Sequence, residues 1–251
     1  MSGDLVSIIT PAYNAERFVV DTIRSVQAQT HKNWEMWIAD DGSKDSTARL
    51  VEEEQARDPR IHLIRLPGNG GPALARQAAL ERARGRYIAF LDSDDLWLPR
   101  KLERQIEFMS EKNRALSFSS YRRVSQDLDK VGRLISVPEV IDYKALLRHN
   151  VIATLTAMVD VSLTGRLKMT NEGYDDFILW LGLTKRGFKA HGLNEDLARY
   201  RIVGGSVSRK RSRAARWVWT IYRKVERLPL WYAAWNFMLF SFFRVRKHTG
   251  F

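Results

Sequence analysis

Three carboxylates are crowded into the segment A-F-L-D-S-D-D-L-W-L-P at residues 89–99. Asp92, Asp94 and Asp95 directly follow an apolar run that is typical of a buried strand. Carboxylates at i and i+2 that leave a strand together can direct oxygens into one space. Hard cations such as Mn²⁺ or Mg²⁺ prefer oxygen ligands and commonly keep substrate phosphates as further ligands. The pattern therefore indicates a site for a metal-bound diphosphate, although a solvated turn in which Asp95 caps the next helix would look the same.

The segments that must position these acids alternate between two patterns over the first 120 residues. Short runs rich in β-branched residues predict strands at 5–10, 35–40, 61–66, 86–92 and 116–124. Helical spacing of apolar residues, or start and stop signals, predict helices at 15–29, 41–55, 72–85 and 99–112. Ser43 or Asp45 is expected to cap the second helix, Pro72 to open the third and Gly85 to end it. Residues 125–170 show neither pattern.

This alternation predicts an α/β fold with a mainly parallel, Rossmann-like sheet flanked by helices. Ligands of such sheets bind beyond the carboxyl ends of the strands. Four loops, at residues 11–14, 40–43, 68–71 and 92–95, should therefore meet along one edge. Two of these loops carry paired acids, which places the expected chemistry at that edge.

The net charge of +12 is concentrated at the end of the 251-residue chain. From Arg201 onward twelve Lys and Arg face one acid, Glu226, so the remaining body is nearly neutral. A uniformly basic nucleic-acid binder would not be divided in this way. The absence of cysteine excludes disulfides and thiol chemistry, and the N-terminus is typical of a first strand rather than a signal peptide.

Four motifs in order resemble the inverting family 2 glycosyltransferases, which have the GT-A fold and include enzymes of bacterial cell-surface polysaccharide and lipooligosaccharide synthesis. They are V-S-I-I-T-P-A-Y-N, W-I-A-D-D-G-S, N-G-G-P-A-L-A-R-Q-A-A-L and G-R-Y-I-A-F-L-D-S-D-D-L-W-L-P. The resemblance spans residues 5–105 and resumes at 172–208. It implies a nucleotide-sugar donor, here a UDP-sugar.

The resemblance implies that Pro11, Tyr13 and Asn14 shape the pocket for a uracil-type base and that Asp41 accepts a hydrogen bond from that base. A tyrosine ring can stack on a base, and a carboxylate can accept an imide N–H. From the residues alone, Tyr13 could instead be in ordinary half-buried packing, and Asp41 with Gly42 could form only a turn.

For the diphosphate, the resemblance implies that Arg76 neutralises donor charge, that Asp92 contacts ribose or the metal, with Ser93 beside it, and that Asp94 is the principal metal ligand. The cofactor would be Mn²⁺ or Mg²⁺. The asparagine that usually follows this arginine is Gln77 here. Arg76 could instead be a solvated helix residue.

Residues 172–188 have the apolar spacing of a helix that lies on the core, with Asp175 and Asp176 at its start. Acids there favour the helix dipole, so capping is one interpretation. The family places its general base at the position of Asp176, which would take a proton from the acceptor hydroxyl. The family commonly has another acid two residues later, where this chain has Ile178.

The segment Y-R-I-V-G-G-S-V-S-R at 200–209 resembles a family motif whose histidine is replaced by Val203. Arg201, Ser206 or a basic residue of the tail could supply the missing ligand.

In the tail, sixteen uncharged residues lie between Arg227 and Arg244, fewer than a bilayer crossing requires. The aromatic and basic tail suggests an amphipathic helical segment on an anionic membrane surface, or one packed on the catalytic domain or on a second subunit.

The domains expected are a GT-A catalytic domain at 1–208, with a nucleotide-sugar half (1–105) and an acceptor half (106–208), and a helical tail at 209–251. The function expected is transfer of a sugar from a UDP-sugar to a growing surface glycan or glycolipid, forming a β-linkage. The enzyme would be cytoplasmic and peripheral on the inner face of the plasma membrane, without nucleic acid and possibly as a homo-oligomer.

Two other functions are compatible with parts of the sequence. The pattern G-N-G-G-P-A at 68–73 satisfies the G-x-G-x-x-A of dinucleotide-binding oxidoreductases, although it follows the third predicted strand and not the first. The tail alone would also suit a non-catalytic, basic membrane-binding protein. Neither alternative accounts for the acids at the sheet edge.

Overall fold

A computed structural model of the chain describes residues 4–203 and 211–247, without the side chains of 211–214 and 243–247. Its strands form one ten-stranded sheet in the order β3-β2-β1-β4-β9-β6-β10-β5, with β7 added to β6 and β8 to β10. The strands are β1 (Val6–Ala12), β2 (Trp34–Asp40), β3 (Ile61–Arg65), β4 (Tyr87–Phe90), β5 (Leu96–Trp97), β6 (Leu116–Ser125), β7 (Val131–Ile135), β8 (Val140–Ile141), β9 (Met158–Asp160) and β10 (Ala190–Ile202). The helices are α1 (Val19–Gln27), α2 (Thr47–Arg57), α3 (Pro72–Arg82), α4 (Lys101–Ser110), α5 (Tyr143–Arg148), α6 (Val161–Thr164), α7 (Asp175–Lys185), α8 (Arg211–Thr220) and α9 (Leu230–Lys247), with a 3₁₀ turn η1 (Thr154–Thr156) and a π turn η3 (Ile221–Val225).

The first half of the sheet is parallel, as the sequence predicts. Strands β3, β2, β1 and β4 pair side by side in one direction. Strand β1 continues through Pro11, where the sequence predicted a turn. Pairing with β4 ends at Ile9 opposite Phe90, so no N–H is needed from Pro11 on that side.

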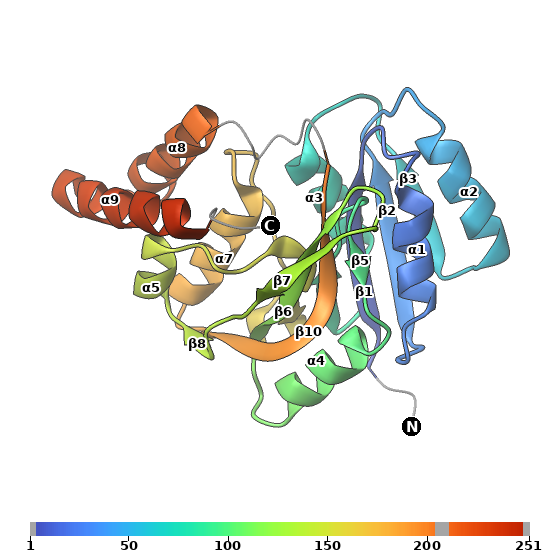
Figure 1. The fold of residues 1–251 in the computed structure, drawn as a ribbon, viewed down its shortest axis with the longest axis horizontal. Coiled ribbons are helices and arrows are strands. Elements are labelled where there is room, and N and C mark those ends of the chain that lie inside the picture. Colours follow the sequence, from blue (N-terminus) through green and yellow to red (C-terminus); the bar gives the residue numbers. More distant parts are fainter. Residues whose placement is uncertain (1–3, 204–210, 248–251) are drawn as a thin grey trace.

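The second half of the sheet is mixed. The short strand β9 runs antiparallel between β4 and β6, while β6 and β10 are parallel to each other. Strand β10 also pairs antiparallel with β5 and β8, and Figure 1 shows it curving along the sheet. Strand β9 has only three residues and lies in the region without a sequence pattern, so its insertion between two predicted strands could not be foreseen.

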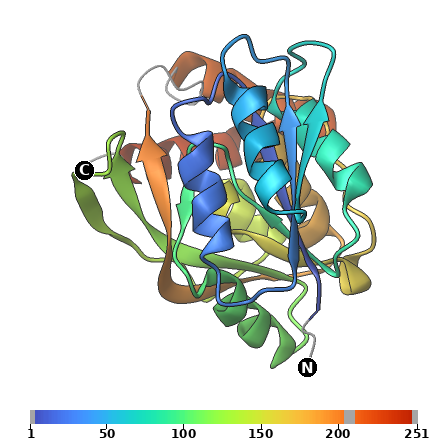
Figure 2. The ribbon, with the colours of Figure 1, turned by 90° about the vertical axis from the view of Figure 1, so that its right-hand side faces the viewer.

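Side chains that alternate along the central strands divide the core between the two faces of the sheet. Ile8 and Ala89 pack on the face covered by α1, α2 and α4, whereas Ile9 and Phe90 pack on the face covered by α3, α5 and α7. Figure 2 looks onto α1 and α2 with the sheet behind them. The helices on both faces confirm the layered α/β architecture.

The predicted start and stop signals of the helices are confirmed in part. Asp45, and not Ser43, accepts a hydrogen bond from the Thr47 N–H at the start of α2, at 3.0 Å. Pro72 opens α3 as predicted. Gly85 does not end that helix, which stops at Arg82. It lies against β1 instead, where a Cβ at this position would be 2.6 Å from the Ser7 nitrogen.

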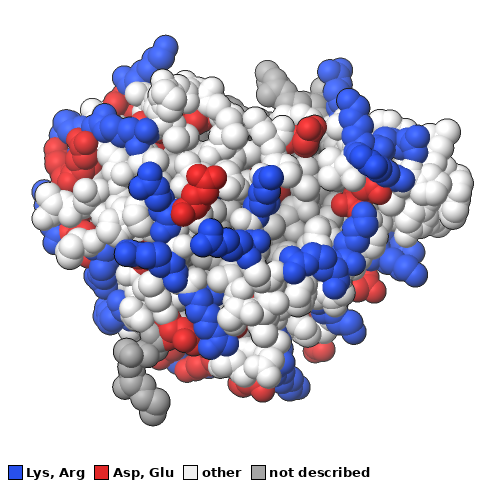
Figure 3. All heavy atoms as spheres, turned by 180° about the vertical axis from the view of Figure 1, so that it is seen from behind, with Lys and Arg blue, Asp and Glu red and all other residues white. Residues whose placement is uncertain are grey.

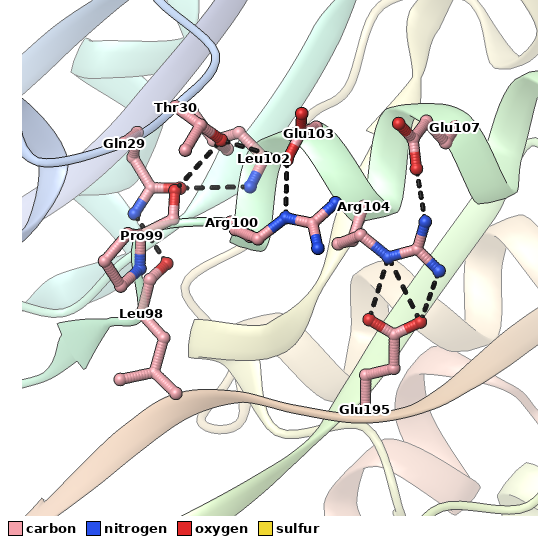
Figure 4. A network of polar contacts seen from close by, with 10 residues as sticks. All are labelled: Gln29, Thr30, Leu98, Pro99, Arg100, Leu102, Glu103, Arg104, Glu107 and Glu195. Carbon is pink, nitrogen blue, oxygen red and sulfur yellow. Dashed lines mark hydrogen bonds and ion pairs between the residues drawn. The ribbon is translucent and has the colours of Figure 1, made fainter.

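The loop that carries the three acids is fastened to α1. The Thr22 hydroxyl donates to the carbonyl oxygens of Ser93 and Asp95, at 3.0 and 2.9 Å. Just after α1, the Gln29 side chain donates to the carbonyl of Leu98 and accepts from the N–H of Leu102 (Figure 4). The path from the acid loop into α4 is therefore held in place from one side by a neighbouring helix.

The C-terminal helices pack on the body of the molecule, beside α5 and α7 (Figure 1). Val218, Ile221 and Tyr222 are fully buried and belong to the same apolar core as α7. Glu226 accepts from the Tyr143 hydroxyl at 2.6 Å and pairs with Lys185 at 2.8 Å. Of the three places suggested for the tail, packing on the catalytic part is thus observed. Among the described residues, no helix has both the length and the apolar character needed to cross a membrane.

Candidate active site

A cleft of about 1590 Å³ opens where β1, β2 and β4 end. All nine residues that the sequence predicted for the site lie along its wall: Pro11, Tyr13, Asn14, Asp41, Arg76, Asp92, Ser93, Asp94 and Asp176. The structure therefore brings together residues that are spread over most of the chain. Their individual roles stay predictions.

Tyr13 and Asn14 stand at the end of β1. Tyr13 is 45% exposed and lines the cleft, which agrees both with a role in base binding and with ordinary half-buried packing. Asn14 joins the loops after β1 and β2, since its N–H donates to the Ser43 hydroxyl and its Oδ1 accepts from the Lys44 N–H, each at 2.9 Å. Tyr13 lines the cleft and lies next to a turn that these two hydrogen bonds stabilise.

Asp41 is buried beneath the loop between β3 and α3. Its two carboxylate oxygens accept from the N–H groups of Gly70 and Gly71, at 2.9 and 2.7 Å. In a dinucleotide-binding fingerprint the backbone of such a glycine loop approaches the pyrophosphate of the cofactor. Here these two N–H groups bind a carboxylate of the protein itself. This arrangement does not fit the oxidoreductase alternative.

Arg76 lies at the centre of the site and links its two acidic ends. It is only 6% exposed, so the alternative of a solvated helix residue is wrong. One guanidinium nitrogen donates to Asp92 Oδ1 at 2.5 Å, and another donates to Asp175 Oδ2 at 2.7 Å. Burial alone would lower the pKa of Arg76, but these two carboxylates raise it above its ordinary value. The guanidinium is therefore fixed between the acid loop and the first turn of α7.

Asp94 and Asp95 differ in their surroundings. Burial, and then the charge of Asp92, raise the pKa of Asp94 to about 6. Asp95 is 1% exposed and its Oδ1 accepts from the backbone N–H of Arg201 in β10, at 2.9 Å. Asp95 does not cap α4, which begins at Lys101. It ties the acid loop to the far half of the sheet and leaves Asp92 and Asp94 facing the cleft.

The carboxylate oxygens of Asp92 and Asp94 suit a divalent cation whose remaining ligands come from a bound substrate. Arg76 pairs with Asp92 and Asp175, and Arg201 pairs with Asp21, so neither arginine forms an ion pair with Asp94 within the described ranges. Residues 4–203 and 211–247 contain no group of three His, Cys, Asp or Glu that could chelate a metal unaided. Mg²⁺ is usually held by one or two carboxylates together with substrate phosphates. Asp94 and Asp92 match that arrangement.

Asp176 stands in the first turn of α7 and lines the same cleft as Asp94. Its Oδ2 accepts from the Thr154 hydroxyl at 2.6 Å, and its Oδ1 accepts from the N–H of Phe177 at 2.7 Å. Burial, and then the charge of Asp175, raise the pKa of Asp176 to about 6, against the opposing effects of Arg76 and of these hydrogen bonds. Such a carboxyl is ionised at neutral pH and still basic enough to accept a proton in a reaction.

Several cleft residues were missed by the sequence analysis. Thr154 lies in the stretch without periodicity, and nothing in the sequence marks it. Trp217 and Phe240, from α8 and α9, also line the cleft, whereas the sequence analysis named only a basic residue of the tail as a candidate for the site. The high tryptophan content of the tail was a signal, but it did not indicate which side chains face the site.

The segment that lacks the usual histidine is described only up to Val203, which lines the cleft. Arg201 is 4% exposed, and its guanidinium pairs with Asp21 at 3.3 Å and lies over the ring of Phe18. Ser206 lies outside the described residues. The substitute for the histidine therefore stays a prediction.

Comparison with known proteins places these observations in a family. The family described as glycosyl transferase family 2 matches residues 7–168. A putative teichuronic acid biosynthesis glycosyltransferase of Bacillus subtilis, TuaG, is 45% identical over 97% of this chain and 97% of its own. WfgD of Escherichia coli, a UDP-Glc:α-D-GlcNAc-diphosphoundecaprenol β-1,3-glucosyltransferase, is 35% identical over 92% of this chain and 90% of its own.

Solved structures share the fold at low sequence identity. The S. aureus TarS fragment 1–349 in complex with UDP aligns with a TM-score of 0.68 and 18% identity, over 87% of this chain and 65% of that one. The mannosyltransferase PcManGT of Pyrobaculum calidifontis, in complex with GDP-Man and Mn²⁺, aligns with a TM-score of 0.67 and 18% identity, over 89% of this chain and 64% of that one. The likeness agrees with the expected GT-A fold.

Replacement of Arg76 by methionine tests the central ion pairs. Loss of the guanidinium leaves Asp92 and Asp175 in a buried site without their cation, so the free energy of unfolding should fall by about 3–5 kcal/mol. Urea denaturation measures this change. Arg49→Met, which removes an exposed pair with Glu53, should cost less than about 1 kcal/mol. Similar losses in the two variants would show that Arg76 does not hold the site together.

Proposed function

Because the chain belongs to glycosyl transferase family 2, we propose that it moves one sugar from a UDP-sugar to a hydroxyl of a growing surface glycan, with inversion at the anomeric carbon. The observation that carries the proposal is the arrangement around Arg76. The acid loop suited to a metal–diphosphate and the helix that bears Asp176 line one cleft and are joined by this arginine.

The choice of a UDP-sugar is supported by two kinds of relative. WfgD and WfaP are named as enzymes that use UDP-Glc. TarS, which has the same fold, has been solved with UDP and with UDP-GlcNAc. In this chain Tyr13 would stack on the base, and Asp41, held rigid by Gly70 and Gly71, would accept its imide N–H.

Asp94 and Asp92 would hold Mn²⁺ or Mg²⁺ together with the diphosphate of the donor. When bound, the cation stabilises the negative charge that develops on the departing nucleoside diphosphate. Arg76, which is already fixed by two carboxylates, adds positive charge beside the same oxygens. The chain's own contribution is thus to orient the diphosphate and to keep its charge close to Arg76.

Replacement of Asp94 by alanine tests the metal site. The wild-type protein should bind UDP more tightly with Mn²⁺ than without it, and Asp94→Ala should lose that difference, because a carboxylate ligand is missing. Isothermal titration with UDP measures both affinities. Asp127→Ala, at a carboxylate that is 77% exposed, is the control. A wild-type UDP affinity that does not respond to Mn²⁺ would contradict the assignment.

Asp176 would act as the general base. The acceptor hydroxyl loses its proton to Asp176 as its oxygen bonds to the anomeric carbon and the bond to the diphosphate breaks. A single displacement of this kind inverts the anomeric centre and gives a β-linkage from an α-linked donor. The hydrogen bonds from Thr154 and Phe177 hold the carboxylate in place for the transfer.

Replacement of Asp176 by asparagine should lower kcat by about 10²–10⁴, the usual contribution of a general base, while UDP binding is retained. Product formation from UDP-glucose, followed by chromatography, measures kcat. The anomeric proton coupling of the product reports the linkage. A retained configuration would exclude single displacement, and near-normal turnover would exclude Asp176 as the base.

The pH dependence of kcat offers a further test of Asp176. Because the base must be ionised, kcat should fall as the pH drops through about 6, the value to which the pKa of Asp176 is raised. Thr154→Val removes a hydrogen bond that lowers this pKa, so the acidic limb should move to higher pH. Rates at saturating donor and Mn²⁺ give the profile. An acidic limb at the same pH in both proteins would show that another group controls it.

We also propose that residues 1–208 form the catalytic domain, with a donor half at 1–105 and an acceptor half at 106–208, and that 209–251 is a docked helical segment that meets the membrane. Along α9, Trp231, Trp235, Met238 and Phe242 recur at helical spacing and are 50–74% exposed. In the view of Figure 3 the outer end of the molecule that α9 forms is covered mainly by side chains without charge. Exposed basic residues stand close by in the chain: Arg223, Lys224 and Arg227.

An apolar stripe beside basic residues suits the interface of a membrane with anionic lipid. WfgD and WfaP are named for acceptors that carry diphosphoundecaprenol, and such an acceptor would be presented from that surface. We therefore propose a peripheral enzyme on the inner face of the plasma membrane, acting on a lipid-linked glycan.

Replacement of Trp231 and Trp235 together by serine tests the membrane surface. Sedimentation with vesicles that contain anionic phospholipid should show a loss of binding of roughly tenfold or more, because two large apolar side chains no longer enter the interface. Leu163→Ser, at an exposed apolar residue of α6, is the control. If vesicle binding is unchanged but size-exclusion chromatography shows that a dimer is lost, the stripe is a subunit interface instead.

A further inference from the structure

Trp217 connects the C-terminal helices to the catalytic part of the cleft. It belongs to α8 and lies against the segment that leads into α7. Gly173 has a φ of +109°, and a Cβ at this position would be only 2.7 Å from Cγ of Trp217. The glycine is therefore required both by its backbone conformation and by the close approach of the indole.

The ring of Tyr174 meets Trp217 edge to face, with centroids 5.2 Å apart and planes at 79°. This contact fixes the orientation of the indole. Trp217 remains only partly buried and lines the cleft. A rigid aromatic surface is thus presented to the space in front of α7.

The position of Trp217 places it on the acceptor side of the site. The aromatic pair ends at Tyr174, and Asp176 follows two residues later in the first turn of α7. The residues expected to bind the base, Tyr13 and Asp41, come from the ends of β1 and β2 in the other part of the cleft wall. A molecule whose hydroxyl reaches Asp176 would therefore approach the segment on which the indole packs.

The chemistry of this wall fits a sugar ring. A pyranose presents C–H groups on its faces, which can pack on an aromatic ring, and hydroxyls at its rim, which need polar partners. Aromatic side chains with a few polar groups are typical of such small-molecule sites. Polar residues that line the cleft include Asn171 and Glu172, which precede Gly173 in the chain, and Thr220, which follows Trp217 by about one helical turn.

We propose that Trp217 is the platform on which the acceptor's sugar ring lies, so that the C-terminal helices complete the acceptor subsite. This inference rests on the proposed function, because it takes Asp176 as the base that defines where the acceptor hydroxyl must be. Trp217 is then a binding residue for the acceptor and makes no contact with the donor. The catalytic part of the chain without α8 would have an incomplete site.

The test measures KM for acceptor and donor separately. The probes are UDP-glucose with Mn²⁺ as donor and, as acceptors, a panel of monosaccharides α-linked through diphosphate to a short alkyl chain, beginning with N-acetylglucosamine. Trp217→Leu should raise the acceptor KM roughly tenfold, as expected for loss of one aromatic face from a binding site. The donor KM and the slow hydrolysis of UDP-glucose without acceptor should stay within about twofold of wild type.

Two further variants separate binding from folding. Trp217→Phe keeps a smaller aromatic ring and should give an intermediate acceptor KM. Trp219→Leu removes a tryptophan of the same helix that packs on Phe237 of α9, at 5.5 Å between ring centroids, and should leave the acceptor KM unchanged. An unchanged acceptor KM in Trp217→Leu, or an equal rise in Trp219→Leu, would overturn the platform.

The proposed function is judged by separate outcomes of the same assay. Full activity of Asp176→Asn would contradict the assignment of Asp176 as the general base, whatever the result for Trp217. Failure of the wild-type protein to transfer glucose or any other UDP-linked sugar to every member of the panel would overturn the proposed function and the acceptor subsite with it. A third outcome is that the wild type transfers the sugar, Asp176→Asn abolishes the transfer and Trp217→Leu does not change it. This outcome would contradict only the proposed role of Trp217 in acceptor binding.

Discussion

The site depends on one buried cation. Arg76 reaches Asp92 on one side and Asp175 on the other, and so it fixes the spacing between the acid loop and α7. Withdrawing three charged groups from water is costly, and a hydrophobic replacement of such a group of ions can be as stable. The pairing is better understood as a constraint on geometry. It holds together two carboxylate-rich segments, which would otherwise repel each other, in the wall of one cleft.

The rest of the fold supports this constraint from both faces of the sheet. Hydroxyl and amide groups of α1 and the loop after it hold the acid loop from one side, through Thr22 and Gln29. Asp95 attaches the same loop to β10 and thereby to the mixed half of the sheet. Thr154 approaches from η1 and fixes the carboxylate of Asp176. Asp95 and Asp176 therefore do not depend on ion pairs alone, since backbone N–H groups and the Thr154 hydroxyl also hold their carboxylates.

Much of this site could be predicted from the sequence because its residues lie in strand-end loops with recognisable composition. The acids at 92–95, Asp41 with its glycine and the pair at the start of α7 all follow or precede clear strand and helix patterns. What could not be predicted are partners far apart in the chain. Capping was one interpretation of Asp175, and its pairing with Arg76 was not foreseen, because only tertiary structure brings together these residues, which lie 99 positions apart. Thr154 and β9 lie in a stretch whose short elements are too brief to show a period. The position of Trp217 in the cleft could not be predicted, because the sequence of a basic tail does not indicate whether a tryptophan side chain contacts lipid, solvent or a cleft.

The burial of Tyr222 has a consequence for how the protein unfolds. Its ring is fully enclosed and its hydroxyl donates to the carbonyl of Leu147, so the last helices share their interior with α5 and α7. They cannot separate from the body without opening the apolar layer beneath α7. Detachment of the C-terminal helices would therefore expose apolar side chains of α7, so the stability of the first turn of α7 is coupled to the packing of these helices.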